Sequence, residues 1–556
     1  MADISSSSKT AEVGESYRPD ETQFDAVAST DGQATLKRDL SRRHINMIGL
    51  AGMIGTGLFL ASGQALSVAG PVGALFGYLV MSGLTASVSL TIAELSAFMP
   101  VTGGFIRHAS RFIQPAMGAA TGWNYFYLMA VTGPAELSAA ATLINFWHPD
   151  VSPALWYSIF IVLIVIMSLC GVRVYGESEV FFSMIKILLI IGLILAGIIV
   201  DLGGSPTHDR IGFRYWKDPG PFNAYLIGGN TGKFLGFWST LISAAYAFCN
   251  IQVVALTGAE TKNPRKLIPE AMKMTFWRII VFYCISMFVV GLLVPYNDPN
   301  LGNATGTAQQ SPFVIAFQRA GIKVLPSIIN AALVTSAFSC GMAVVFLASR
   351  VLCGLAEEGQ APRIFLKTNR LGAPYPAVIV SSLFLPLVYL SLGSNSSVAF
   401  GWFVNIATVA SLIAWLIIEI TYLRFFYAFK AQGIARERLP YKSPLQPYMA
   451  WLTTLLLALI ILFSGYSVFL HGHWDTDSFL VSYIGIPIFL CEIPEAHVLL
   501  KEKLTTSTVL WASAFLFLRT GIIPLREIDL SEIEIIEREK ELRPAEKKLP
   551  WYRVLV

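Results

Sequence analysis

Residues 52–57 read Gly52-Met53-Ile54-Gly55-Thr56-Gly57 and lie inside an apolar segment that extends over 46–67. Three glycines within six residues weaken a helix, because each costs roughly 1 kcal/mol relative to alanine. A break here would free backbone N–H groups at the positive start of the second half-helix and carbonyls before the break. The N–H groups suit a carboxylate and the carbonyls suit an ammonium. The pattern therefore predicts a site for a zwitterion, with close helix packing through small residues as the alternative.

The composition of the whole chain excludes several classes of protein. Of its 556 residues, 54% are hydrophobic and 14% are charged, whereas soluble domains carry about 25% charged residues. The net charge of +4 comes from short basic clusters, without the basic face of a nucleic-acid-binding protein. The six cysteines lie in or beside apolar runs and indicate neither a disulfide framework nor a zinc site. No HExxH, GxSxG or Walker motif occurs, so we expect neither an enzyme nor an ATP-driven pump.

Apolar segments long enough to cross a bilayer recur along the chain and predict an all-α integral membrane protein. We count twelve: 46–67, 72–99, 116–147, 154–172, 175–201, 234–258, 276–296, 326–349, 376–392, 397–421, 449–470 and the short 479–491. Lys and Arg number twenty-one in one set of loops and six in the other, which predicts a cytosolic N-terminus.

These segments divide the chain into four parts. We expect a disordered cytosolic tail over 1–44, a transmembrane domain over 45–491, and a charge-dense cytosolic tail over 518–556. The C-terminal tail could form an amphipathic helix at the membrane surface. Residues 492–517 fit no single span and form an atypical segment that replaces or extends the last helix.

The sixth segment, 234–258, is predicted to contain a second break in its helix. It contains Tyr246-Ala247-Phe248-Cys249-Asn250-Ile251-Gln252. Amides inside an apolar run are costly unless they are paired, so Asn250 and Gln252 either satisfy an unwound backbone or contact a ligand. Broken helices at positions one and six, five helices apart, predict a five-plus-five inverted repeat of the LeuT type.

Three ionisable residues lie within apolar segments. Glu94 is near the end of its segment, where it can snorkel or pair with Arg107 or Arg111, and we interpret it as a structural residue. Glu136 and Lys186 lie deeper, where a charge costs on the order of 3 kcal/mol and usually marks a transport pathway. We predict that Lys186 braces segment one against segment eight at the place where related architectures bind sodium, with a structural ion pair to Glu136 as the alternative.

Several motifs, in order, resemble those of fungal amino acid permeases, the yeast branch of the amino acid–polyamine–organocation superfamily. The likeness covers about 37–490 and resumes near 518–530. The matching stretches include 36–38, 43–49, 55–59, 103–105, 122–125, 259–266, 348–350 and 439–444. The loop 201–216 is similar to that of a subset that includes acidic amino acid permeases.

The resemblance implies a twelve-helix symporter that imports amino acids with protons across the plasma membrane. It implies amino acid, proton and lipid partners, and no cofactor, metal or nucleic acid. The expected substrate contacts are Met53, Ile54, Gly55, Thr56, Gly57, Tyr246, Phe248, Cys249, Asn250 and Gln252. Among them, the resemblance assigns the substrate carboxylate to 55–57, its ammonium to the carbonyls of 53, 246 and 249, and a gating role to Phe248. Glu136 and Lys186 match positions where the family also places an acid and a lysine, and we expect these two residues to serve coupling.

The chain also departs from the family pattern. Residues 250–252 read Asn-Ile-Gln where the family usually has Gly-(Thr/Ser/Val)-Glu, so Gln252 replaces a carboxylate tied to proton coupling. Residues 341–343 read Gly-Met-Ala where Gly-Asn-Ser is common. Three interpretations follow: a site tuned to another side chain, coupling through Glu136 and Lys186, or a non-transporting amino acid sensor of the same fold.

Overall fold

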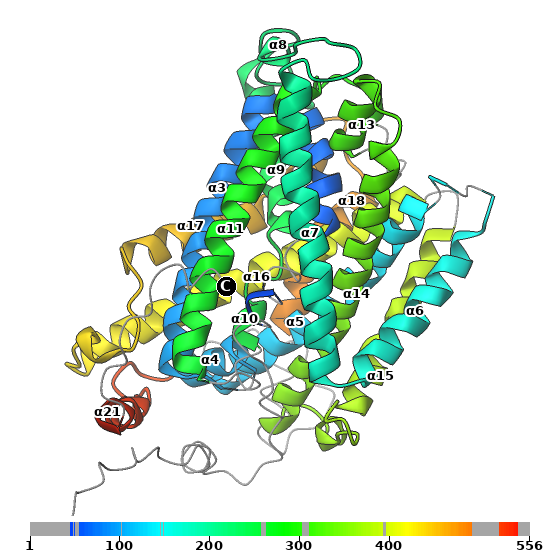
Figure 1. Ribbon diagram of the computed structural model, residues 1–556. Coiled ribbons are helices and arrows are strands. Elements are labelled where there is room, and N and C mark those ends of the chain that lie inside the picture. Colours follow the sequence, from blue (N-terminus) through cyan, green and yellow to red (C-terminus); the bar gives the residue numbers. More distant parts are fainter. Residues whose placement is uncertain are drawn as a thin grey trace, which may run out of the picture. The chain divides into compact units, whose positions relative to one another are not determined.

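The computed structural model describes residues 45–47, 49, 55–101, 103–144, 146–147, 150–256, 263–302, 311–392, 396–491 and 522–542, all within one compact unit (Figure 1). Every regular element in these ranges is helical. The elements are η1 (Gly57–Ala61), α3 (Ser62–Phe98), α4 (Phe105–Phe112), α5 (Pro115–Ile144), α6 (Pro153–Leu169), α7 (Val172–Asp201), α8 (Arg214–Lys217), α9 (Gly229–Ala247), α10 (Val253–Leu256), α11 (Pro264–Leu293), α12 (Pro299–Gly302), α13 (Pro312–Arg319), α14 (Leu325–Glu357), η4 (Arg363–Leu366), α15 (Tyr375–Ser382), η5 (Leu385–Leu392), α16 (Ser396–Ala431), η6 (Arg436–Arg438), α17 (Tyr448–Leu462), η7 (Tyr466–Phe469), α18 (Thr476–Tyr483) and α21 (Glu532–Leu542).

Seven helices in the described ranges are long and apolar enough to span a membrane, and two shorter apolar helices, α6 and α17, accompany them. The all-helical architecture that the sequence predicts is therefore confirmed, whereas the count of twelve spans stays a prediction. Two expected spans run together in α3, and the sixth is divided between α9 and α10. The tail 1–44 and the atypical segment 492–517 lie outside the described residues.

Helix α3 changes direction at the boundary between the first two expected segments. Gly70 has φ 74° and ψ 172°, and Pro71 follows it. Proline removes a helical N–H, and only glycine adopts this backbone without strain. A Cβ at Gly70 would also lie 2.8 Å from the backbone nitrogen of Asn223. The kink separates 62–69 from 71–98, as the sequence separates 46–67 from 72–99.

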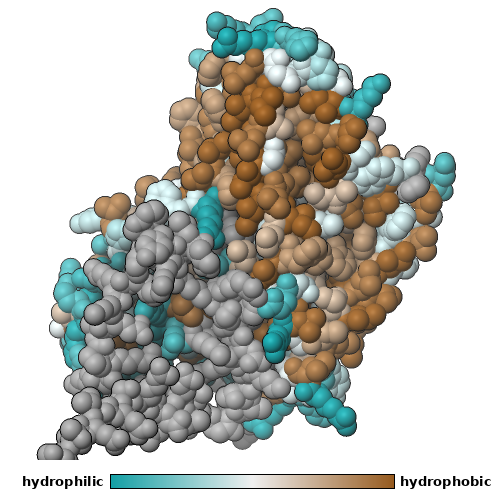
Figure 2. Space-filling view, in the orientation of Figure 1, coloured by the Kyte–Doolittle hydropathy of each residue, from teal (hydrophilic) through white to brown (hydrophobic). Residues whose placement is uncertain are grey.

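Helix α7 has a polar buried face and an apolar exposed face. Phe181, Leu188 and Leu195 recur every seven residues and are 56–67% exposed, whereas Glu179 and Lys186 are almost fully buried. Figure 2 shows a broad hydrophobic surface in this region, below a hydrophilic cap. Exposed apolar and buried charged side chains are the arrangement expected of a helix at a lipid boundary.

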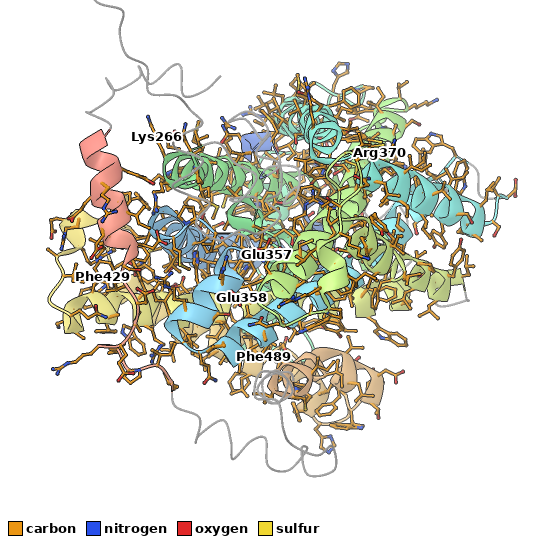
Figure 3. All side chains as sticks on the ribbon, turned by 90° about the horizontal axis from the view of Figure 1, so that it is seen from below. Lys266, Glu357, Glu358, Arg370, Phe429 and Phe489 are labelled. Carbon is orange, nitrogen blue, oxygen red and sulfur yellow. The ribbon has the colours of Figure 1, made fainter. Side chains whose placement is uncertain are left out.

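Two groups of helices position the site. Helix α5 packs mainly against α14 and α16, and α3 packs mainly against α9 and α11. We call the end of the molecule that carries α21 the α21 end, and the end that carries α8 the α8 end (Figure 1). In the view from below, Glu357 and Glu358 lie centrally at the α21 end, where α14 stops (Figure 3).

Glu94, in α3 near the α21 end, has a partner other than the two expected. Its buried carboxylate forms an ion pair with Arg436 and accepts hydrogen bonds from Tyr422 Oη (2.8 Å) and the Ser443 backbone N–H (2.7 Å). Arg107 instead pairs with Glu358, and Arg111 with Asp529. The structural role of Glu94 fits this setting, but the predicted partners were wrong, because the true one lies more than 300 residues away in sequence.

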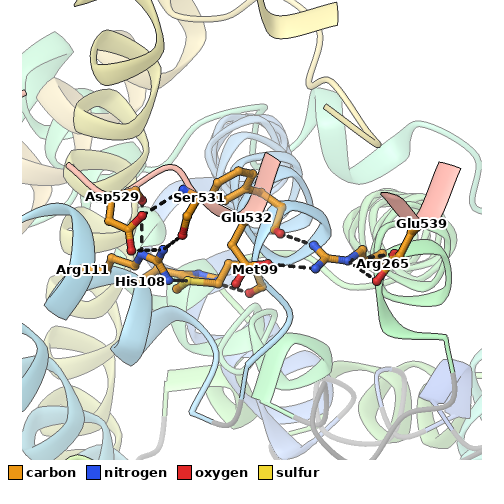
Figure 4. A network of polar contacts seen from close by, with 9 residues as sticks. Met99, His108, Arg111, Arg265, Asp529, Ser531, Glu532 and Glu539 are labelled. Atoms are coloured by element: carbon orange, nitrogen blue, oxygen red, sulfur yellow. Dashed lines mark hydrogen bonds and ion pairs between the residues drawn. The ribbon is translucent and has the colours of Figure 1, made fainter. Parts of the chain in front are cut away.

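Residues 522–542 dock onto the α21 end through polar and apolar contacts (Figure 4). Arg111 of α4 pairs with Asp529 at 2.5 Å, and Arg265 of α11 pairs with Glu532 at 2.9 Å and Glu539 at 3.2 Å. Ile528, Leu530, Ile533 and Ile536 join a buried cluster that includes Phe98, Phe112, Phe425 and Phe429. The tail does form an amphipathic helix, α21, but its apolar side packs against the protein itself.

His108 of α4 belongs to the same network of polar contacts (Figure 4). Its ring Nε2 lies 2.8 Å from the carbonyl oxygen of Met99, the residue whose sulfur accepts a hydrogen bond from Arg111. Burial lowers the pKa of His108 to about 4, so the ring is neutral at pH 7 and its Nε2–H donates to Met99. A neutral ring adds no positive charge beside Arg111.

The pair of Arg265 and Glu532 yields a stability prediction. Both side chains are 17% exposed, so the pair should contribute about 1 kcal/mol and weaken in high salt. Glu532→Lys is expected to lower the melting temperature of the purified protein, and adding Arg265→Glu to it should recover part of the loss, because Glu539 would still repel the new carboxylate. Glu537→Lys is the control, because its pair with Arg438 is 41–45% exposed and should matter less. A double reversal no more stable than the single variants would contradict the pairing.

Candidate functional site

The sixth expected segment is interrupted in the structure. Helix α9 ends at Ala247, α10 begins at Val253, and residues 248–252 between them are not helical. Asn250 has φ 71°, a left-handed conformation that asparagine tolerates better than most residues. An interrupted helix leaves carbonyls without helical partners, and the carbonyl of Ala247 accepts a hydrogen bond from Tyr283 Oη of α11 at 3.0 Å.

The first expected segment comes close to this interruption. Gly55 is a bend, Thr56 begins the helix, and η1 is a π-helical turn; such turns are frequent at functional sites. A Cβ at Gly57 would lie 2.8 Å from the Cα of Ala247, so glycine is required for this approach. Met53 and Ile54 lie outside the described residues.

Glu136 of α5 lies where the two segments meet. Its Oε1 accepts hydrogen bonds from Thr56 Oγ1 at 3.1 Å and from Tyr246 Oη at 3.3 Å. The same oxygen would be 3.0 Å from a Cβ at Gly55. The carboxylate is buried, so a change in its charge would alter its hydrogen bonds to both segments.

Lys186 of α7 is buried and interacts electrostatically with two carboxylates, Glu136 and Glu179. One turn earlier on the same helix, Ser183 Oγ donates to the carbonyl of Met47 at 2.8 Å. Ser339 Oγ of α14 donates to Glu179 Oε2 at 3.1 Å. The face of α7 that carries Lys186 thus contacts both segment one and segment eight, and the bracing role of Lys186 itself stays a prediction.

The remaining expected site residues pack against aromatic side chains. Phe248 is fully buried, with ring centroids 6.3 Å from Tyr78 and 4.8 Å from Tyr283. Gln252 Oε1 accepts a hydrogen bond from Trp415 Nε1 of α16 at 2.9 Å. Asn250 Oδ1 has a longer contact, 3.5 Å, with Tyr125 Oη of α5.

These contacts bear on the two amides. Both are held by side chains of neighbouring helices. Cys249, also buried, completes the interruption. These contacts hold the unwound segment to α5 and α16, and a contact of either amide with a ligand stays a prediction.

Two buried carboxylates escaped the sequence analysis, so the count of three embedded ionisable residues was too low. Glu179 precedes Lys186 by seven residues and lies on the same face of α7, a spacing that could have revealed it. Glu419 of α16 is fully buried, with Oε1 3.5 Å from Thr91 Oγ1 of α3. Among the residues that the structure describes, no three His, Cys, Asp or Glu side chains gather as a metal site.

Comparison with known proteins assigns a family. The model of the family described as Amino acid permease matches residues 44–507. A proline-specific permease of Emericella nidulans is 42% identical over 460 residues, which cover 82% of this chain and 84% of that protein. A dicarboxylic amino acid permease of Saccharomyces cerevisiae is 37% identical over 538 residues, covering 95% and 88%. A basic amino-acid permease of the same yeast is 39% identical over 473 residues, covering 85% and 82%.

A solved structure gives a more distant likeness. The manganese transporter of Eremococcus coleocola superposes with a TM-score of 0.52 over 85% of this chain and 98% of that one, at 14% identity. At that identity the likeness concerns the fold alone.

Proposed function

Because the chain belongs to the amino acid permease family, we propose that it imports amino acids across the plasma membrane together with protons. Family membership makes it a membrane transporter of amino acids and not an enzyme. The observation that carries the proposed proton coupling is the position of Glu136, whose Oε1 accepts hydrogen bonds from Thr56 of segment one and Tyr246 of segment six. A group that gains a proton there links proton binding to substrate binding.

The substrate is held as a zwitterion between the two interruptions. Its carboxylate lies at the N–H groups of 55–57, where the second half of segment one begins and the helix dipole is positive. Its ammonium lies at the carbonyls of Met53, Tyr246 and Cys249. The close approach of Gly57 to Ala247 supports this, because it brings the two backbones together.

Coupling runs through Glu136 and Lys186, since Gln252 cannot carry a proton in the way a carboxylate does. The hydrogen bond from Trp415 fixes Gln252, and the electrostatic contact of Lys186 with Glu136 supplies a buried titratable pair. The alternative of a non-transporting sensor draws no support from the named relatives, which are permeases.

Transport proceeds by alternating access around the two interruptions, within twelve spans arranged as a five-plus-five inverted repeat. The interruption at 248–252, the kink at Gly70 and the transporter fold support this arrangement. The excess of Lys and Arg in one set of loops supports a cytosolic N-terminus and assigns the α21 end to the cytosol.

Uptake of labelled amino acids in cells without endogenous permeases tests the proposal. Proline, glutamate and lysine form the first panel, because the named relatives are permeases for proline, dicarboxylic and basic amino acids. Saturable accumulation that an uncoupler abolishes supports proton symport. Accumulation that survives the uncoupler contradicts the coupling, and signalling without any uptake supports the sensor.

Thr56→Val probes the contact between segment one and Glu136. Valine keeps the shape of threonine but removes the hydroxyl that donates to the carboxylate, a loss of about 1.5–3 kcal/mol for a charged acceptor. We expect uptake to fall at least tenfold with normal surface expression. Thr85→Val is the matched control, because that buried hydroxyl donates only to carbonyls of its own helix. Equal uptake in both variants would remove Thr56 from the site.

A further inference from the structure

We infer that Glu179 is a second proton-carrying residue, which receives the coupling proton from Lys186 and releases it toward the α21 end. The inference rests on the proposed function and adds to it a second proton-carrying residue and the direction in which the proton leaves. It starts from the placement of Glu179, which the sequence did not single out and which is fully buried.

The polar residues of α7 form a column on one face. Tyr175, Glu179, Ser183 and Lys186 are all buried and are spaced by four, four and three residues. That spacing keeps side chains on one side of a helix. Glu179 and Lys186 are two turns apart, or about 10.5 Å along the axis. Because α7 starts at the α21 end (Figure 1), Glu179 lies between Lys186 and that end.

Within the part of the chain that the structure describes, only one of the two oxygens of the Glu179 carboxylate accepts a hydrogen bond. Oε2 accepts from Ser339 Oγ at 3.1 Å, whereas Oε1 is buried and has no hydrogen-bond partner among the described residues. A buried carboxylate oxygen without a donor is costly. A proton on Oε1, or a donor that arrives during the transport cycle, would remove that cost.

The charged and titratable groups around Glu179 fit a relay. Lys186 on its own helix interacts with it electrostatically, and Cys340 does so from α14. Glu136 of α5 interacts with the same lysine. One cation thus interacts with two carboxylates, one at the substrate site and one nearer the α21 end.

The transfer can be written with atoms in balance. An N–H bond of the Lys186 ammonium breaks and an O–H bond forms at Glu179 Oε1, which converts the ammonium and the carboxylate into a neutral amine and a carboxylic acid. The amine then takes the proton of the Glu136 carboxyl group. Glu179 releases its proton to water from the α21 end, and the net result is one proton moved from Glu136 to that water.

A stacked aromatic pair closes the column in this structure. Tyr175, one turn before Glu179, stacks on Phe346 of α14 with ring centroids 3.7 Å apart and planes 6° apart. We therefore expect water from the α21 end to reach Glu179 when α7 and α14 move apart at this stack. This ties proton release to a conformational step, as symport requires.

Glu179→Gln tests the inference, because glutamine keeps an oxygen for the Ser339 hydroxyl but cannot take a proton from Lys186. We expect uncoupler-sensitive accumulation to fall at least tenfold and to lose its dependence on external pH. Exchange of labelled for unlabelled substrate, which needs no net proton release, should stay within about threefold. Glu179→Asp should restore the pH dependence in part. Glu177→Gln, two residues away and exposed, is the matched control and should behave as the unmodified protein.

The other outcomes separate the possibilities. A Glu179→Gln protein that accumulates substrate with the original pH profile overturns the relay, and so does one that loses exchange and accumulation to the same extent, which marks a merely structural residue. Absence of proton-dependent accumulation in the unmodified protein overturns the proposed function and the relay with it. If Glu179→Gln does not reach the surface, Ser339→Ala carries the test. Loss of that donor should shift the pH midpoint of accumulation upward by about one unit, and an unshifted midpoint overturns the relay.

Discussion

Replacement of Gly57 by leucine is expected to abolish amino acid uptake while the protein still reaches the cell surface. A Cβ at this position would lie 2.8 Å from the Cα of Ala247 and 3.2 Å from its backbone nitrogen. Backbone atoms cannot rotate away as a flexible side chain can, so segments one and six must separate. Overpacking of this kind costs about 1–3 kcal/mol, which corresponds to roughly 5- to 150-fold weaker binding if the cost falls on the substrate-bound state.

Replacing Gly57 by side chains of increasing size distinguishes a defect in the substrate site from a defect in folding. Gly57→Ala should already reduce uptake, and Gly57→Leu should remove it. Gly83→Ala and Gly83→Leu are the controls in α3, because Gly83 is exposed and a Cβ there would meet nothing within 4 Å. Surface labelling reports the amount of each variant. Normal uptake by Gly57→Leu would show that the approach of the two segments is not part of the substrate site.

The sequence predicts those features of the fold that depend on local composition. Apolar runs of about 20 residues locate the long helices, and the amides of residues 250 and 252 in an apolar run mark the interruption between α9 and α10. The division between 46–67 and 72–99 lies at the Gly70 kink, because glycine and proline disrupt helices locally. Whether such a division is a loop or a kink within α3 depends on packing against residues such as Asn223.

The candidate site was predictable to a lesser extent. Glu136 and Lys186 are conspicuous because charge in the middle of an apolar run is rare. Glu179 is closer to the start of its segment, where charge is common, and only the burial of that face of α7 sets it apart. Glu94 was paired with arginines nearby in sequence, whereas Arg436 comes from a distant turn. Partners across the fold depend on tertiary packing, which a single sequence does not encode locally.

The same long-range packing makes Lys186→Met the second large effect that we expect. Methionine has nearly the length of lysine but no charge, so the two buried carboxylates that interact with Lys186 lose their cation. Removing one partner of a buried ionic cluster costs about 3–5 kcal/mol unless the remaining charges are neutralised. In this setting the carboxylates are expected to retain protons instead. Uptake driven by a proton gradient should therefore fall at least tenfold and lose its pH dependence.

A double variant separates the loss of coupling from the loss of stability. Adding Glu179→Gln to Lys186→Met removes one of the two uncompensated carboxylates, so surface expression and melting temperature should recover relative to Lys186→Met alone. Accumulation should not recover, because no cation remains beside Glu136. Partial recovery of stability in the double variant, with transport no lower than in Lys186→Met alone, would be the signature of residues that share one ionic cluster and one proton path. Lys186→Arg keeps the charge but holds its proton more firmly, so it should be stable and still impaired in pH-dependent uptake. An unchanged pH profile in Lys186→Met would exclude Lys186 from coupling and leave the cluster a purely structural one.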